Sequence, residues 1–123
     1  MSKSANPGEL RTRVYFSRVE RETNENYVEQ ETEVSVLTDE DDMPRPARCK
    51  WVNAHGSESW SDQALQLRNP ATLTTRYNPA LLDRSLIIYR YGDSEPYEVI
   101  DIDNVRQLNK WLEIKVVRKV NAR

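Results

Sequence analysis

The stretch LRTRVYFSRVERETNENYVEQETEVSV, residues 10–36, decides the fold class because its side chains repeat every two residues. Leu10, Val14 and Phe16 lie on one face of the first half, and in the second half Val28, Gln30, Thr32, Val34 and Val36 alternate with Glu29, Glu31, Glu33 and Ser35. A two-residue repeat is typical of a strand with one buried face. The polar turn TNEN, residues 23–26, separates the two halves. The stretch therefore predicts strands over residues 9–20 and 28–36, joined as a hairpin with one acidic, solvent-facing side.

Working outward, the same alternation predicts five further short strands, over residues 47–53, 71–77, 86–89, 97–100 and 112–120. The run at 86–89 is apolar on successive residues, which is typical of a strand covered on both faces. The apolar parity slips between Val99 and Ile100, which indicates a β-bulge. The segment GSESWSDQAL, residues 56–65, changes to helical spacing and predicts a helix over residues 57–67. Seven short strands and one helix predict a small, mainly β barrel or sandwich.

The length of 123 residues fits one domain. Because 31% of the residues are charged and only 37% are hydrophobic, the chain can fill a thin core but not also line a deep apolar pocket, so no cofactor is expected. We expect a flexible leader at 1–8, one domain at 9–120 and a tail at 121–123. The N-terminus shows no apolar signal region and no apolar run approaches a membrane span, so synthesis in the cytoplasm without membrane insertion is expected.

Charge is distributed unevenly along the chain. Residues 20–42 carry ten acids against Arg21, whereas residues 104–123 carry six bases against Glu113. Both runs can be ordinary solvated surface; alternatively they are complementary patches on opposite edges of a subunit, as a head-to-tail ring contact requires. The segment TDEDDMPRP, residues 38–46, combines four consecutive acids with two prolines and predicts an exposed, mobile loop.

No catalytic or metal-binding motif is recognisable. A lone His55 and a lone Cys49 cannot close a zinc site, and no nucleophile, base and orienting group occur together, so an enzyme is not expected. The four acids at 39–42 lack the alternating spacing and the glycine of a calcium loop, so no metal is expected there. Acids that line a pore have another use, since they repel the phosphates of passing DNA.

A single-strand-binding small barrel is an alternative of a different class. Its base-stacking platform and backbone contacts would come from aromatic and basic side chains in the second half of the chain. The candidates are Tyr89, Tyr91, Tyr97 and Trp111 with Arg90, Arg106 and Lys110. Against this alternative, the chain is slightly acidic, and strand aromatics more often anchor cores or interfaces.

Several short motifs together resemble the phage head-tail adaptor family, also described as head-tail joining or head-closure (stopper) proteins. The opening GELRTRVYFSR after Pro7 is similar to the first strand of these proteins, and GSESWSDQAL, TTRY at 74–77 and YEVIDID at 97–103 follow in the family's order. The resemblance covers roughly residues 7–118. The region 37–50 is longer and more acidic than the usual link, and Trp60 stands where relatives often have Tyr or Phe.

The resemblance implies a small antiparallel β-barrel of about six or seven strands, with one short α-helix inserted after the third strand. It implies a structural virion protein that forms a homo-oligomeric ring in the neck, closes the DNA-filled capsid and joins it to the tail. Its partners would be a portal or adaptor ring on the head side, a tail terminator or tail tube protein on the tail side, and packaged double-stranded DNA in the channel. A tail-completion or tail-terminator ring protein is the alternative within the same class.

Two sets of candidate site residues follow. The resemblance implies that the acidic loop at 38–48 points into the channel, with these members: Thr38, Asp39, Glu40, Asp41, Asp42, Met43, Pro44 and Arg45. Basic and aromatic side chains are the candidates for contacts with neighbouring subunits or partners: Arg11, Arg13, Trp60, Tyr89, Arg106, Lys110 and Trp111.

Overall fold

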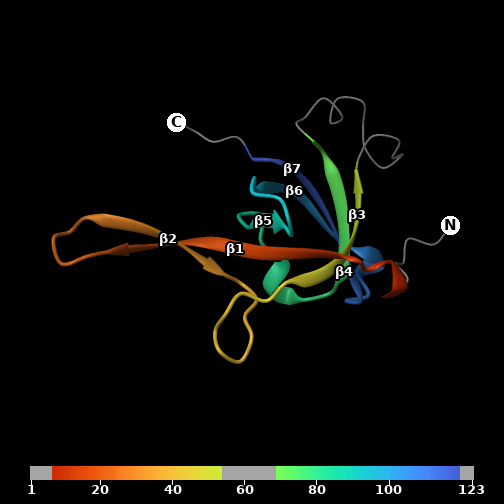
Figure 1. Cartoon of the computed structure of the whole chain (residues 1–123), viewed down its shortest axis with the longest axis horizontal. Coiled ribbons are helices and arrows are strands. Elements are labelled where there is room, and N and C mark those ends of the chain that lie inside the picture. The colour runs from red at the N-terminus through yellow and green to blue at the C-terminus, as the bar shows by residue number, and fades with distance from the viewer. Residues whose placement is uncertain (1–6, 54–68, 120–123) are drawn as a thin grey trace.

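The computed structural model describes residues 7–53 and 69–119, and in this part all strand pairings are antiparallel (Figure 1). The strands are β1 (Thr12–Thr23), β2 (Glu29–Ser35), β3 (Ala47–Asn53), β4 (Ala71–Arg76), β5 (Ile87–Arg90), β6 (Tyr97–Asn104) and β7 (Trp111–Arg118). Three single-turn 3-10 helices accompany them: η1 (Pro7–Glu9), η3 (Pro79–Leu81) and η4 (Val105–Gln107).

Six of the strands close into a barrel. β1 pairs with β3, the sheet continues through β4, β7, β6 and β5, and β5 pairs back onto β1. The closing ladder runs from the pair Val14–Arg90 to the pair Ser17–Ile87. β2 lies outside the barrel and pairs with the distal half of β1, from Ser17–Ser35 to Thr23–Glu29. Because the six barrel strands are all paired on both sides, the open sheet edges are concentrated on the β1–β2 ribbon.

Alternate residues of the barrel strands point inward and form one core. The largest fully buried side chains include Phe16 of β1, Leu73 of β4 and Ile114 of β7. Leu81 of η3 is also buried, because the 3-10 turn folds it onto this cluster. The core therefore has the alternating pattern on which the sequence-based strand predictions rest.

The structure confirms the mainly β, barrel-type fold and corrects its details. The bulge is confirmed, since the β6–β7 register shifts between Val99 and Asp101. β6 does not end at Ile100, as predicted, but continues to Asn104, because the bulge resets the parity and lets Ile102 pack against the core. The predicted helix at 57–67 lies outside the described residues, and the described part contains only 3-10 turns and no α-helix.

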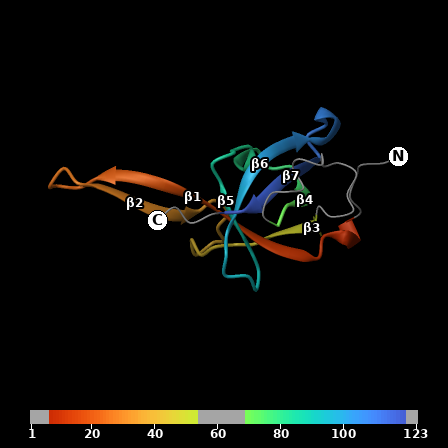
Figure 2. The same cartoon turned by 90° about the horizontal axis from the view of Figure 1, so that it is seen from above.

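The hairpin formed by β1 and β2 extends well beyond the barrel (Figures 1 and 2). The sequence predicted one wet face, but both faces are solvent-exposed beyond Arg18, and Val19 and Val28 are largely exposed. The alternation of β2 therefore does not report a buried face, because within the described chain no element covers the ribbon there. We call residues 18–34 the arm.

A cluster of aromatic rings and ions ties β3, β5, β6 and β7 together. The rings of Trp51 and Tyr97 meet edge to face at 4.9 Å, with Arg90 over the first and Arg118 over the second. The Asp93 carboxylate lies 2.9 Å from the Arg118 guanidinium and 3.7 Å from that of Arg90. Hydrogen bonding from the Glu95 backbone and from Arg118, with the two positive charges, holds the pKa of Asp93 below its usual range.

We expect Asp93→Asn to lower the free energy of unfolding by about 1–3 kcal/mol, since the side chains of Asp93 and Arg118 are only 17% and 11% exposed and the charge-assisted bond is largely desolvated. Because the folded-state pKa of Asp93 is depressed, its stabilisation is present above the ordinary carboxyl pKa and is lost as pH falls through the folded value. Chemical denaturation of the variant should thus lose part of the acid-side pH dependence.

The matched control is Asp101→Asn, which removes a carboxylate from the exposed pair with Arg84. An exposed ion pair contributes little, so this variant should unfold almost like the parent chain. Equal destabilisation by both variants would contradict the role assigned to Asp93.

Candidate assembly surfaces

The tip of the arm is a tight turn capped by a side chain. The Asn24 side-chain oxygen accepts hydrogen bonds from the backbone N–H groups of Asn26 and Val28, at 2.9 and 3.0 Å. The backbone of Asn24 also donates to Val28 and accepts from Tyr27. These four bonds define a three-residue hairpin loop, in which the last loop position adopts the left-handed conformation usually given to glycine.

Tyr27 occupies that left-handed position, with a φ of 61°. Its side chain is 90% exposed, the highest value among the exposed large hydrophobic residues. A positive φ is costly for a bulky side chain, and here the Asn24 bonds fix the turn in spite of that cost. The arm therefore presents an aromatic ring at its tip on a well-defined backbone.

The predicted channel loop is a second hairpin with the same cap. The Asp39 carboxylate accepts bonds from the N–H groups of Asp41 and Met43, and Asp42 takes the left-handed position with a φ of 60°. Thr38 and Pro44 form a bridge at its base. Composition predicted an exposed, mobile loop that resists pairing. The loop is exposed, but its two sides do pair: the Asp39 N–H donates to the Met43 carbonyl, the Arg45 N–H donates to the Leu37 carbonyl, and the Asp39 side chain caps the tip.

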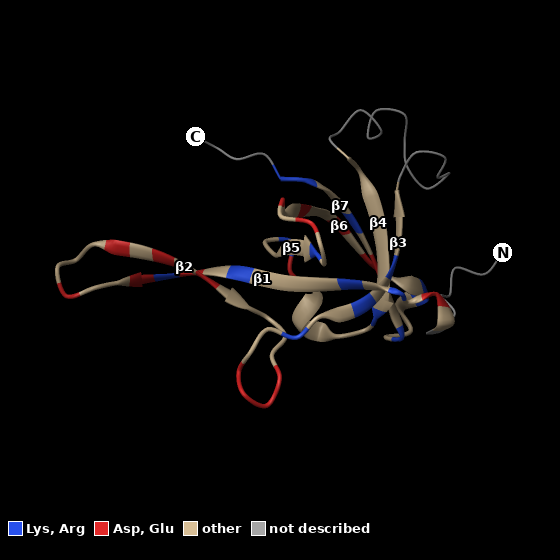
Figure 3. Cartoon of the chain, viewed as in Figure 1, with Lys and Arg blue, Asp and Glu red and all other residues tan. Residues whose placement is uncertain are grey.

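All eight predicted loop residues, from Thr38 to Arg45, are exposed and lie together in this hairpin. Arg45 bends back, so that its Nε donates to the Thr38 carbonyl at 3.4 Å. Figure 3 shows the acidic hairpin and the acidic arm as two separate projections from the barrel.

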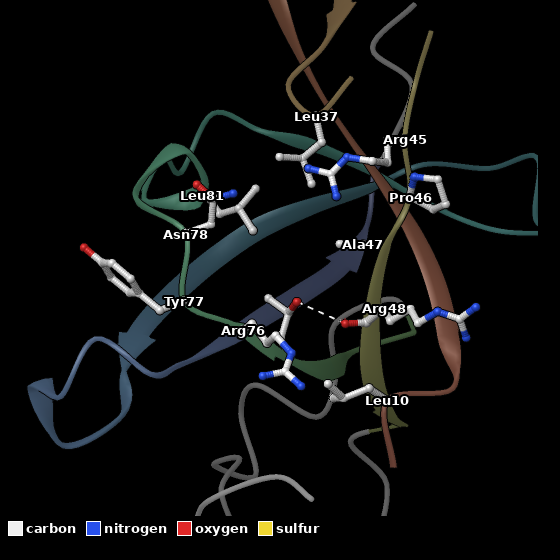
Figure 4. Close-up of a pocket in the computed structure, with 11 residues that line it drawn as sticks. Leu10, Leu37, Arg45, Pro46, Ala47, Arg48, Arg76, Tyr77, Asn78 and Leu81 are labelled. Atoms are coloured by element: carbon white, nitrogen blue, oxygen red, sulfur yellow. Dashed lines mark hydrogen bonds between the residues drawn. The ribbon is translucent and has the colours of Figure 1, made fainter. Parts of the chain in front are cut away.

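A basic groove lies at the opposite end of β1 from the tip of the arm (Figure 4). It has a volume of about 470 Å³, and its apolar lining includes the buried side chains of Leu10, Leu37 and Leu81. Around it stand the exposed side chains of Arg45, Arg48 and Arg76. In the part of the chain that the structure describes, none of these three guanidinium groups pairs with a carboxylate; Arg76 instead lies over the Trp111 ring.

The predicted contact residues do not form a single patch. Arg13 stacks on Tyr91 beside the β1–β5 ladder, whereas Trp111 lies on β7 opposite Arg76, next to the groove. The other predicted contact residues are scattered. Arg11 donates to the Gly8 carbonyl and Tyr89 lies on β5. Arg106 and Lys110 lie in the connection between β6 and β7, and Trp60 lies outside the described residues.

The described part of the basic run, residues 104–119, does not form one patch either. The side chain of Arg118 is mostly covered and is committed to Asp93 and Glu95. A different set of exposed positive charges, which the sequence analysis missed, comes from Arg45, Arg48 and Arg76 around the groove. Arg45 and Arg48 are close in sequence, but Arg76 is distant and comes near them only through the β3–β4 ladder, so no local pattern could have revealed the set.

The base-stacking platform of the single-strand-binding alternative is not assembled. Tyr97 is only 3% exposed and packs in the core against Trp51. Tyr89 and Tyr91 lie around β5, whereas Trp111 lies on β7 beside Arg76. Because these rings do not share an exposed face, they cannot stack successive bases of one strand.

At the base of the arm, the Tyr89 hydroxyl donates a 3.0 Å hydrogen bond to the Glu33 carboxylate. This bond joins β5 of the barrel to β2 of the arm. Partial burial of the ring, and then the hydrogen bond and charge of Glu33, raise the pKa of Tyr89 to about 12. The contact thus ties the base of the arm to the barrel.

Other functional groups are sparse in the described part of the chain. No group of three or more His, Cys, Asp or Glu side chains there could hold a metal ion. No helix in the same residues is long and apolar enough to cross a membrane.

A small closed β-barrel with projecting, charged hairpins is an architecture suited to assembly with other proteins. The family model for the phage head completion protein matches residues 5–119, and the chain therefore belongs to this family. A search of curated proteins gave no match. The family is structural, so the chain is a structural phage protein of the head-tail region and is located in the virion. The resemblance seen in the sequence is thus confirmed.

We expect Glu33→Gln to lower the pKa of Tyr89 from about 12 while leaving it above the ordinary tyrosine value, because burial, the larger cause, remains. Because the pKa of Tyr89 is raised in the folded state, the contribution of its hydroxyl to folding stability is complete below the ordinary tyrosine pKa and is lost as pH rises through about 12. An ultraviolet titration, with Tyr89→Phe to identify the signal, measures the shift. Glu31→Gln, which lies further out on β2 and is paired with Arg21, should leave it unchanged.

Proposed function

We propose that the protein forms a homo-oligomeric ring at the neck of a tailed phage, where it closes the DNA-filled head and provides the seat for the tail. Its neighbours would be the portal or an adaptor ring on one side and the tail terminator or tail tube on the other. The family membership supports a head-tail role, and the closed barrel with projecting hairpins suits a subunit whose contacts are made by its extensions.

The observation that carries the proposal is the capped acidic hairpin at residues 38–44. It presents Asp39, Glu40, Asp41 and Asp42 on a short, defined turn that stands away from the barrel (Figure 3). A ring repeats this turn once per subunit, so a modest cluster becomes a collar of carboxylates around the axis. We propose that this collar faces the channel.

The mechanism is electrostatic and steric. Carboxylates around a narrow passage repel the phosphates of the duplex, so DNA neither adheres to the wall nor slides freely past the constriction. No bond is made or broken, and no cofactor is needed. Retention ends when the hairpins are displaced, for instance by engagement of the tail.

The test neutralises the hairpin without changing its shape. Asp39→Asn, Glu40→Gln, Asp41→Asn and Asp42→Asn together remove four charges. An asparagine side chain can still cap the turn at position 39, and asparagine tolerates the left-handed conformation at position 42. We expect particles with this variant to assemble but to retain DNA less well, measured as nuclease-accessible DNA in tailless heads.

The control neutralises Glu98 and Asp103 on β6, which should leave retention unchanged. Normal retention by the quadruple variant would sink the channel role of the hairpin. The single variant Asp39→Ala separates shape from charge further, because it removes the cap and should alter the shape of the hairpin as well as its charge.

A further inference from the structure

We infer that the tip of the arm docks into the basic groove of a second copy of this chain, with the Tyr27 ring as its anchor. The inference rests on the proposed ring and names the contact that would hold its subunits together. It is argued from the exposed surface of the arm, the charges on both sides and the positions of arm and groove on the barrel.

The arm has the features of a surface that binds a partner. Six residues of β1, 18–23, extend past the closing ladder with β5, which corresponds to roughly 20 Å of strand. The ribbon has two open edges, and beyond its base, where Glu33 is hydrogen-bonded to Tyr89, no other described strand pairs with it. An isolated two-stranded ribbon is marginally stable in water, so a second surface that covers it would complete its stabilisation.

Tyr27 is the most informative residue of the tip. A glycine would satisfy a φ of 61° at no steric cost, yet the chain places a large aromatic there and leaves it 90% exposed. Local folding therefore does not account for the tyrosine. Exposed tyrosines that enter an apolar pocket on a partner are frequent energetic anchors of protein interfaces.

The charges of tip and groove are complementary and otherwise unpaired. Around Tyr27 the carboxylates of Glu22, Glu25 and Glu29 have no ion-pair partner in the described chain, whereas Glu20 and Glu31 are paired within the arm. The groove offers the opposite set, three guanidinium groups without carboxylate partners around an apolar lining. A tyrosine flanked by three acids matches an apolar groove flanked by three arginines.

The arrangement of the arginines favours an extended protein segment over a small anion or DNA. In Figure 4 the guanidinium groups of Arg45, Arg48 and Arg76 lie well apart, that of Arg48 on the side of β3 away from Leu81, and they do not converge on one point. The lining between them includes Leu10, Leu37 and Leu81, which offers apolar surface that a phosphate backbone would not use. The fold already pairs arginine with aromatic rings, as in Arg13 over Tyr91 at 4.9 Å, so Tyr27 among these arginines is chemically consistent.

The positions of the two surfaces determine the kind of assembly. β1 spans twelve residues, with the groove beside its start and the arm at its end, so a chain cannot place its arm in its own groove. Two different surfaces that meet between copies form a heterologous contact, and such contacts build rings when the rotation closes. Each subunit of the ring would then give one arm to a neighbour and receive one arm from the other.

The first test replaces Tyr27 within the full chain. Tyr27→Gly should leave the unfolding transition unchanged or shift it to higher denaturant, because glycine suits the turn, yet it should lower the number of copies per particle by at least about tenfold. Tyr27→Phe, the matched control, should incorporate like the parent. Normal incorporation of the glycine variant would overturn the inference.

The second test identifies what Tyr27 touches. A photoreactive benzoylphenylalanine in place of Tyr27 is activated in head-tail joined particles, and the cross-linked peptides are read by mass spectrometry. Cross-links to residues 45–48 or 76–81 of a second copy support the inference. Cross-links to another phage protein, to DNA, or to none of these overturn it while leaving the proposed function intact, whereas absence of the parent chain from particles would overturn both.

Discussion

The ladder that joins β1 to β5 is the constraint on which the rest of the structure depends. It closes the barrel through four pairs, from Val14–Arg90 to Ser17–Ile87, and it stops in the middle of β1. The first half of the strand is thereby committed to the core, and the second half is left to pair with β2 alone. One strand thus supplies both the closure of the domain and its longest projection, which is why arm and groove lie at its two ends.

At the tips of the two projecting hairpins, a side-chain cap supports a residue other than glycine in the left-handed position. The chain has three glycines, and six other residues adopt positive φ in the described part. Asn24 and Asp39 each accept two backbone N–H bonds and thereby fix a hairpin tip. The Asp39 carboxylate both caps its turn and adds a negative charge to the projection, whereas Asn24 caps the other tip without a charge.

The strands could be predicted from the sequence because burial alternates along them, as at Leu10, Val14 and Phe16, and even the bulge after Val99 left a trace in the parity. In the arm the same alternation gave a wrong prediction of a buried face, since Val28 and Val34 alternate with glutamates although the ribbon has no buried face there. The acidic hairpin was located by composition, but its backbone pairing and the Asp39 cap were not predicted. The groove was not predictable, because Leu37, Arg48 and Arg76 meet only after three separate ladders have formed.

The wide sequence separation of the closing ladder also dictates an order of events during synthesis. The β1–β2 hairpin involves near neighbours and can form as soon as it leaves the ribosome, whereas Val14 must wait for Arg90. Until then one edge of β1 is open, and its apolar residues are exposed beside it. The glutamates of the nascent hairpin repel other nascent hairpins during this interval, so the charge that characterises the mature arm also protects the unfinished chain from premature association.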